Sequence, residues 1–513
     1  MKKIFLYVLF ILFSLSLSAY TDPESGVYYE TNSDGTAKVA SDNIGSKLKT
    51  PNIVILSSFS EGGKDYIVTE ISKSAFGGNL YALTGGGDYY ITSVQIPETV
   101  TKIGGGAFAR LYYLTSINLP SNLTKIEPGT FSDCKSITSI SIPEGVKEIG
   151  YNAFRNTGIK KIVIPNSVDK VGSSAFSGCE NLEDVTLPTG LKVLEGGIFQ
   201  NSGLLNINIP NSVTEIQPYA FYGCHLLTSI EMPKNLTKIG NFAFNGCESL
   251  TKLIIPKGVE YIGDWILDGC KSLISIKVDD GNTKYDSRDE CNAIIETASN
   301  TLKVGCMATL IPATVESIGQ YAFSRCIGLG EVVIPGNIRS IAEYAFQFCE
   351  NLLKVKIEEG VEKIGDYSFE NCNNLNTLVL PSTTLQIGYG AFSYCKLESV
   401  TSYIKEPFEL SRGTFITTWT RQELEDGSIH EGITYDVDAT LYVPVGTKGL
   451  YETTMGWNLF KRIEELSGES GINSIIQGHD SVDNTYYSLG GVRINKPLKG
   501  LYIKKGRKTF IKR

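Results

Sequence analysis

One pattern of apolar and polar positions repeats along most of the chain, from Ile96 to Cys395. Each copy has the form Ile-Pro-x-x-Val-x-x-Ile-Gly-x-x-Ala-Phe-x-x-Cys-x-x-Leu-x-x-Ile-x, where x varies between copies. Over long stretches the prolines lie 22 or 23 residues apart, and the phenylalanines keep the same spacing. A fixed period of this length predicts a solenoid in which every copy forms one turn.

The apolar positions within one copy explain why the copies must stack. In the copy that starts at Pro120, the side chains of Leu123, Ile126 and Phe131 cannot all be buried within a single turn. Stacked on similar neighbours, they form a continuous core. Residues 140–142 alternate apolar and polar side chains, which predicts a short strand with one face in the core. The proline that follows ends the strand, because it cannot donate to a ladder.

These motifs resemble the BspA-like leucine-rich repeat family, whose variant repeat is I-P-x-x-V-x-x-I-G-x-x-A-F-x-x-C. The resemblance covers roughly residues 60–470, in about a dozen copies. It implies a right-handed repeat solenoid that is mainly β. One face would carry a parallel sheet, and the convex side would carry short helical or irregular segments.

The resemblance also implies a class of function. In this family the fold occurs on secreted and surface proteins of Gram-negative anaerobes and of some parasites. Some members are linked to adhesion, including the binding of extracellular-matrix proteins. We therefore expect a non-enzymatic secreted or cell-surface protein that binds an extracellular macromolecule, such as a host matrix protein or another cell, through its concave sheet face. The alternatives are a periplasmic or extracellular scaffold and a carbohydrate-active enzyme.

The N-terminal part of the chain divides into a signal and a cap. Residues 1–19 begin with Met-Lys-Lys, continue with an apolar run and end in small residues, which predicts a secretory signal cleaved after Ser18 or Ala19. A retained membrane anchor is the alternative, but the run is short for a span, and no other stretch could form a transmembrane helix. Residues 20–75 contain short strand-like runs between turns, which favours a β cap over the first layer of the solenoid at 76–395.

The C-terminal part has three further segments. Residues 396–468 resemble the family's C-terminal cap, with a strand at 440–444 and a helical turn near 447–451. Residues 469–483 are polar and predict a linker. Residues 484–513 hold nine lysines and arginines and no acid, and they resemble the short sorting modules of type IX secretion. The alternative for this end is a small β-hairpin module without a transport role.

An insert at about residues 279–311 interrupts the repeat. Two apolar runs flank a turn, so the insert predicts a β-hairpin. If Glu296 pairs with Thr301, then Cys291 lies opposite Cys306, and the two form a candidate disulfide. The spacing of the aspartates in the insert matches no calcium-binding loop, which favours a solvated acidic loop.

The net charge and the lack of catalytic motifs exclude further classes of function. The formal charge is −8, and without the basic tail and the two lysines of the signal the remaining chain carries about −19. An acidic body argues against nucleic acid as a partner. The three histidines lie in different regions, and no phosphate loop, dinucleotide fingerprint or zinc spacing is present. We therefore predict no catalytic residues, no cofactor and no metal site.

The repeat cysteines and scattered acids do not change this picture. Nine cysteines recur once per turn in one column, and two copies drop the cysteine and become 22 residues long, which favours free buried thiols over metal ligands. A glycan hydrolase would need two acids in one cleft. The outward acids Asp184, Glu231 and Glu331 lie turns apart.

The remaining candidate site is the outer face of the predicted sheet, where strand residues point away from the core. This face mixes small polar groups, charges and a few aliphatic side chains. The candidate binding positions are Lys161, Val163, Asp184, Thr186, Asn206, Asn208, Ser229, Glu231, Lys252, Ile254, Lys354 and Lys356.

Overall fold

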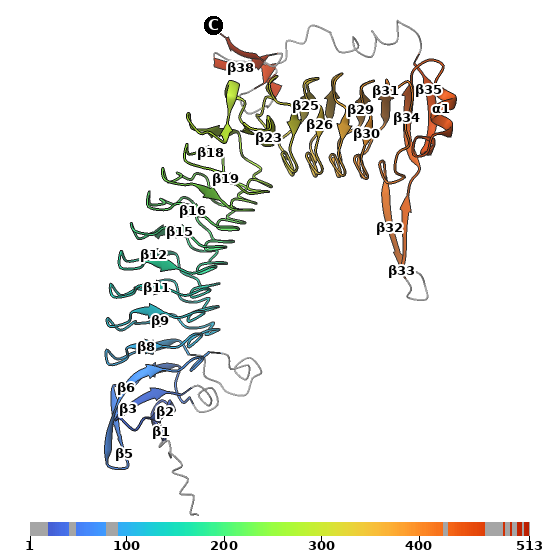
Figure 1. Ribbon diagram of the computed structural model, residues 1–513. Coiled ribbons are helices and arrows are strands. Elements are labelled where there is room, and N and C mark those ends of the chain that lie inside the picture. Colours follow the sequence, from blue (N-terminus) through green and yellow to red (C-terminus); the bar gives the residue numbers. More distant parts are fainter. Residues whose placement is uncertain are drawn as a thin grey trace, which may run out of the picture. The chain divides into compact units, whose positions relative to one another are not determined.

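The computed structural model describes residues 19–40, 48–77, 91–423 and 429–466, and four strands within the tail. The predicted secretory signal up to residue 18 and the predicted linker at 469–483 lie outside the described residues. The chain forms two compact units, Met1–Pro188 and Thr189–Arg513. Within each unit, successive copies of the repeat form successive turns of a mainly β solenoid (Figure 1).

The segments before each proline form parallel strands, which we call the long-strand ladder. These segments alternate buried and exposed side chains, as in Lys161–Val163, where only Ile162 is buried. The sequence predicted this sheet. In the first unit its strands are β4 (Asn52–Val54), β7 (Ser93–Gln95), β9 (Ser116–Ile117), β12 (Lys161–Val163) and β14 (Asp184–Thr186). In the second they are β18 (Lys252–Ile255), β20 (Ser275–Val278), β25 (Glu331–Ile334), β27 (Lys354–Ile357), β29 (Thr377–Leu380), β31 (Ser399–Ser402), β34 (Val437–Val443) and β35 (Phe460–Glu465).

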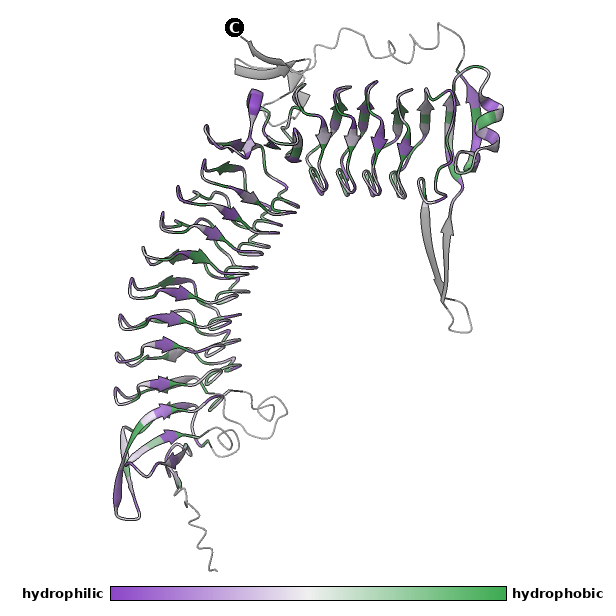
Figure 2. Ribbon diagram, in the orientation of Figure 1, coloured by the Kyte–Doolittle hydropathy of each residue, from purple (hydrophilic) through white to green (hydrophobic). Residues whose placement is uncertain are grey.

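A second parallel ladder, which the sequence did not predict, is built from the x-Ile-Gly segments. Each of the strands named below is two residues long, and its second residue, an isoleucine, valine or leucine, is buried while its first residue is partly or fully exposed. Figure 2 shows hydrophilic and hydrophobic residues mixed along every turn, as this alternation requires. The strands are β8 (Lys102–Ile103), β10 (Lys125–Ile126), β11 (Glu148–Ile149), β13 (Lys170–Val171), β15 (Val193–Leu194), β16 (Glu215–Ile216), β17 (Lys238–Ile239), β19 (Tyr261–Ile262), β24 (Ser317–Ile318), β26 (Ser340–Ile341), β28 (Lys363–Ile364) and β30 (Gln386–Ile387).

The third side of each turn is the Ala-Phe-x-x-Cys segment, and its backbone also bonds to the next turn. The amide of Phe131 donates to the carbonyl of Ala153 at 2.8 Å, and the amide of Phe346 donates to Ser368 at 2.7 Å. The chain is irregular here and not helical, because residues such as Asn152 have a positive φ (54°). Backbone groups of successive turns therefore pair on all three sides, which leaves few of them unsatisfied.

The consensus phenylalanines and cysteines fill the core. Phe108 and Phe131 stack with ring centroids 5.6 Å apart and an interplanar angle of 7°. The thiol of Cys134 donates to the carbonyl of Phe108 in the preceding turn at 3.1 Å, and burial raises its pKa to about 12. In the two 22-residue copies that lack the cysteine, a hydroxyl residue occupies its place: Thr157 contacts Cys179, and Ser202 contacts Cys224. The cysteine position is therefore substituted in these copies and not deleted.

The insert forms the predicted hairpin, with β22 (Ile294–Glu296) antiparallel to β23 (Thr301–Val304). Glu296 pairs with Thr301, which confirms the predicted register at the turn. The register then shifts by one residue, so that the pairing predicted for Cys291 and Cys306 does not extend to them. The predicted disulfide is absent from the structure, in which Cys291 and Cys306 are both free thiols. β23 also pairs with β24, which joins the hairpin to the second ladder.

Each end of the repeat is covered by other elements. At the N-terminal end the sheet has the order β1 (Ala19–Thr21), β2 (Tyr28–Thr31), β3 (Thr36–Val39), β6 (Lys64–Ile71) and β5 (Ser58–Glu61). The cap predicted at 20–75 differs in one respect, because β4 and β6 already pair with repeat strands. The predicted helical turn is α1 (Lys448–Thr453), and beside it the one-turn 3-10 helix η3 (Trp457–Leu459) buries Trp457.

The tail contains a four-stranded antiparallel sheet. Its order is β37 (Arg493–Ile494), β36 (Tyr486–Tyr487), β38 (Gly500–Lys504) and β39 (Arg507–Ile511). It shares no strand pairing with the ladders within the described residues. Before it, β32 (Thr418–Glu423) and β33 (Ile429–Thr434) form a separate antiparallel hairpin.

The stacked phenylalanines give a test of the core. Phe221 is fully buried between Phe199 and Phe244, with ring centroids 5.7 Å and 5.4 Å away. Phe221→Ala leaves a cavity between turns and should lower the free energy of unfolding by about 3–5 kcal/mol. Urea unfolding followed by circular dichroism measures this change. The control is Leu226→Ala, at an exposed position of the same turn, and equal unfolding curves for both variants would show that the phenylalanine column is not a core.

Candidate functional site

The outer face of the long-strand ladder holds the predicted binding positions. Eleven of the twelve are exposed and Ile254 is partly exposed, as their alternation with core residues requires. In the first unit, Lys161 and Val163 lie on β12 next to Asp184 and Thr186 on β14. The positions of the second unit lie on β18, on β27 and in the two turns before β18.

These positions do not form one continuous sheet. Within the second unit, β18 pairs with β20, whereas β27 belongs to a sheet that begins at β25. The hairpin insert lies between β20 and β25 in the chain and interrupts the ladder. Lys252 and Ile254 therefore belong to a different sheet from Lys354 and Lys356.

One part of the predicted face is hollowed. A hollow of about 470 Å³ covers the two turns around β18, and four of its lining residues are predicted binding positions. Ser229 occupies the position that corresponds to Lys252 one turn later, and its small side chain leaves space beside the lysine. The lining residues are Ser229, Ile230, Glu231, Met232, Lys234, Lys252, Ile254, Pro256, Lys257 and Asp279.

The lysines of this hollow differ from three of the other lysines on the face. Among the described residues, none of its three lysines lies within 4.0 Å of a carboxylate oxygen. Three other lysines of the face are paired, whereas Lys277 on β20 is not paired within the described chain. Lys161 lies 4.0 Å from Asp184, Lys354 lies 3.7 Å from Glu331, and Lys356 lies 3.0 Å from Glu358. The hollow thus combines three ammonium groups without ion pairs, the carboxylates of Glu231 and Asp279, and apolar lining from Ile254, Met232 and Pro256.

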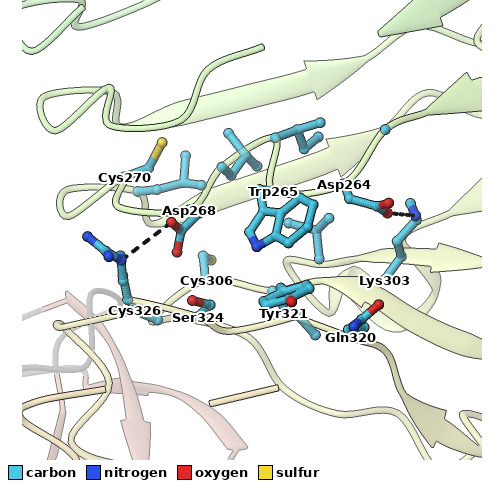
Figure 3. A pocket seen from close by; sticks show the side chains of 18 residues that line it. Asp264, Trp265, Asp268, Cys270, Lys303, Cys306, Gln320, Tyr321, Ser324 and Cys326 are labelled. Carbon is cyan, nitrogen blue, oxygen red and sulfur yellow. Dashed lines mark hydrogen bonds and ion pairs between the residues drawn. The ribbon is translucent and has the colours of Figure 1, made fainter. Parts of the chain in front are cut away.

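A second, smaller cavity of about 30 Å³ lies between the turns at 263–270 and 319–326, on either side of the insert. Figure 3 shows Asp268 between these turns and the rings of Trp265 and Tyr321 beside each other. One carboxylate oxygen of Asp268, Oδ1, is buried without a hydrogen-bond partner, and Oδ2 lies 3.6 Å from Nε of Arg325. A polar cavity of this volume suits one or two water molecules and is too small for a substrate.

The backbone explains why this cavity exists. In the preceding turn the amides of Phe242 and Phe244 donate to Asp264 and Ile266. Within the part of the chain that the structure describes, the corresponding amides of Trp265 and Leu267 have no acceptor. The insert has replaced the turn that would have supplied one. The third-side hydrogen bonds are therefore interrupted at this point.

Sequence reasoning missed a row of aromatic side chains on the third side, which we call the aromatic stripe. Its rings follow one another through successive turns, with centroids between 4.2 Å and 5.4 Å apart. The sequence does contain the pattern that predicts this stripe, because six successive copies carry an aromatic residue two positions before the consensus phenylalanine. The members are Tyr219, Phe242, Trp265, Tyr321, Tyr344, Tyr367 and, one residue earlier in its copy, Tyr389.

The remaining candidate chemistry is dispersed. His225 is exposed, 3.7 Å from Glu248; His430 lies on β33, and His479 lies outside the described residues. Over the described ranges, no three His, Cys, Asp or Glu side chains gather as a metal site would require. Asp184 lies on β14, Glu331 lies on β25, and Glu231 forms only an isolated bridge to Asn208. Of the three acids, only Glu231 lines the hollow around β18.

Sequence comparison agrees with this geometry. The chain matches the family described as BspA type Leucine rich repeat region (6 copies) over residues 87–204, 194–293 and 305–415. The chain belongs to this BspA-type leucine-rich repeat family. No curated protein matches it. No described helix of this BspA-type protein is both long and apolar enough to cross a membrane.

Solved structures resemble the BspA-type protein as well. A leucine-rich repeat protein from Bacteroides ovatus ATCC 8483 is 26% identical, with a TM-score of 0.52, and the match covers 71% of this chain and 98% of that chain. A leucine rich cell surface protein from Faecalibacterium prausnitzii A2-165 is 24% identical with a TM-score of 0.45, and the match covers 89% and 97% of the two chains. The first likeness supports the leucine-rich repeat solenoid. A shared fold does not by itself establish a shared function.

The buried carboxylate in the BspA-type repeat gives a pH-dependent prediction. Burial raises the pKa of Asp268, although hydrogen bonds and Arg325 oppose the shift. In the unfolded chain an aspartate has a pKa of about 3.9. Because the pKa of Asp268 is higher in the folded state, the stability of the fold decreases as the pH rises from about 3.9 through the pKa of the folded state. The variant Asp268→Asn does not lose this stability. The difference in melting temperature between the variant and the parent protein should therefore increase as the pH is raised from about 4 to about 7.

The control for this prediction is Asp264→Asn, which changes an exposed carboxylate in the same turn. Its melting temperature relative to the parent should not follow the Asp268 profile. Parallel profiles for the parent and Asp268→Asn across the pH range would contradict an unfavourable buried charge at Asp268.

Proposed function

We propose that the chain is a secreted or surface-displayed protein that binds an extracellular protein through the outer face of its long-strand ladder. The hollow around β18 is the proposed centre of contact. The observation that carries this proposal is the set of three lysines without ion pairs above an apolar lining. The membership of the leucine-rich repeat family supports it, because solenoid proteins use extended sheet faces as binding surfaces.

The chemistry of the hollow defines the partner. Lys234, Lys252 and Lys257 offer ammonium groups that are not committed to carboxylates of the described chain. Ile254 and Met232 offer apolar contact beside them. A partner segment with acidic side chains next to an apolar one would match both features. An acidic segment of a host matrix protein or of a protein on another cell has this chemistry.

Surface display of the chain is part of the same proposal. The predicted secretory signal at 1–19 would direct export, and cleavage after Ser18 would leave β1 (Ala19–Thr21) intact. The basic module at 484–513 would then direct the chain to the cell surface, as its resemblance to type IX sorting modules implies. The alternative is a scaffold that remains in the periplasm.

Binding can be tested with charge variants of the full chain. Replacing Lys234, Lys252 and Lys257 together by alanine should weaken binding to immobilised extracellular-matrix proteins by at least about tenfold, since three charge contacts of the hollow are lost. Biolayer interferometry measures the affinity. The control replaces Lys238, Lys271 and Lys363, which carry the same charge but do not line the hollow.

Two outcomes would contradict the proposal. Equal affinity of the hollow variant and the control variant would remove the hollow as the contact centre. Binding to polysaccharides but to none of the proteins would replace the protein partner by a glycan. Unchanged melting temperatures of both variants serve as the check that the repeat remains folded.

Sorting is tested by truncation. The tail sheet shares no strand pairing with the ladders in the described structure, so a chain that ends at Leu466 should fold and melt like the full chain. We expect the truncated form to accumulate in the periplasm and the full chain to reach the surface. Protease accessibility on intact cells measures this difference. Equal surface exposure of both forms would exclude a sorting role for the tail.

A further inference from the structure

The aromatic stripe occupies an unfavourable backbone position. Its first six members have a positive φ, between 54° and 62°. This conformation is an outlier for bulky side chains, whereas glycine and asparagine tolerate it. Earlier copies carry such tolerant or small residues at the same position, namely Gly106, Gly129, Asn152, Ser174 and Gly197. The change from small residues to six successive aromatic ones calls for a physical reason beyond the local backbone.

The stripe exposes the edges of its rings and not their faces. Tyr321, Tyr344 and Tyr367 stack with centroids 5.0 Å and 5.1 Å apart and interplanar angles of 7° and 8°. Each inner ring therefore covers the faces of its neighbours, and these three side chains are only partly exposed. A sugar or a nucleobase binds to an aromatic face, so this arrangement does not favour either of them. It favours a chain that lies along the ring edges and hydroxyl groups.

Carboxylates without cationic partners accompany these three tyrosines. Glu343 and Asp366 directly precede Tyr344 and Tyr367, and Glu370 follows Tyr367 by three residues in the same turn. Among the described residues, none of these three carboxylates lies within 4.0 Å of a lysine or arginine nitrogen. Burial, together with carboxylates such as Glu370, raises the pKa of Tyr344 and of Tyr367. The electrostatic potential at this part of the stripe is therefore negative.

We propose that this part of the aromatic stripe is the docking surface for the chain's own basic module, residues 484–513. The module holds nine lysines and arginines and no acid, so its charge complements Glu343, Asp366 and Glu370. Its sequence also contains tyrosine, leucine and isoleucine, which are suited to contact ring edges. This proposal concerns the third side of the turns and does not depend on the proposed binding function of the hollow.

The length of the connection permits this contact. Nineteen residues, 467–485, separate Leu466 from β36, and such a segment can span up to roughly 60 Å. The turn with Tyr344 leads into β27, which lies four strands from β35 in the sheet order. At about 4.8 Å per strand, four steps amount to about 20 Å. A tethered module within this range has a high effective concentration at the stripe.

Trypsin cleavage of the full chain tests the proposal, because docked lysines and arginines are protected. Replacing Glu343, Asp366 and Glu370 by their amides should accelerate cleavage within residues 484–513 by about tenfold, in proportion to the free fraction of the module. The control replaces three exposed carboxylates of the first unit, Glu144, Glu180 and Glu183, by amides. It should be cleaved at the parent rate. Equal rates for all three proteins would overturn the proposal.

Carbodiimide cross-linking of the full chain locates the contact. We expect tail lysines to be linked to Glu343, Asp366 or Glu370 in the monomer, and these products to decrease when Tyr321, Tyr344 and Tyr367 are replaced by asparagine. Asparagine is the matched change, since it occupies the same backbone position at Asn152. Links found only in dimers would show that the tail docks on a second copy and would overturn the intramolecular contact. Links spread evenly over other carboxylates would overturn the site.

Discussion

The structure depends on backbone hydrogen bonds between successive turns. A turn of this repeat has no helix and no complete sheet of its own, so its amides and carbonyls must pair with the turns before and after it. Pairing occurs in the long-strand ladder, in the second ladder and along the third side, where Phe131 bonds to Ala153. The stacked phenylalanines and the buried thiols fill the space between these three rows. Where the insert removes one partner turn, a small cavity and the buried carboxylate of Asp268 result.

This constraint leaves the variable positions open to function. The consensus residues face the core in every turn, so the outward residues can differ between turns without disturbing the stack. Two surfaces of the second unit show this freedom. Three lysines without ion pairs line the hollow around Lys252, and carboxylates without cationic partners accompany Tyr344 in the aromatic stripe. Binding by such a solenoid follows from the sequence of its x positions and not from the fold itself.

Much of the architecture could be predicted from the sequence, because it follows from periodic burial. Phe221 recurs with the period of the repeat, and the hairpin pairing of Glu296 with Thr301 followed from the length of its turn. The second ladder escaped prediction because its two-residue strands are too short to show alternation. The free thiols at Cys291 and Cys306 depend on a register shift that leaves no mark in the sequence. Which lysines lack ion pairs also depends on contacts between turns.

Hydrogen exchange of the folded chain tests the dependence on turn-to-turn bonds most directly. Phe244 and Leu267 occupy corresponding positions in successive turns, but only the amide of Phe244 has an acceptor among the described residues. We predict slow exchange at Phe244, as at Phe131 and Phe346, and markedly faster exchange at Leu267. Equal protection at Phe244 and Leu267, or rapid exchange at all of these amides, would contradict this prediction.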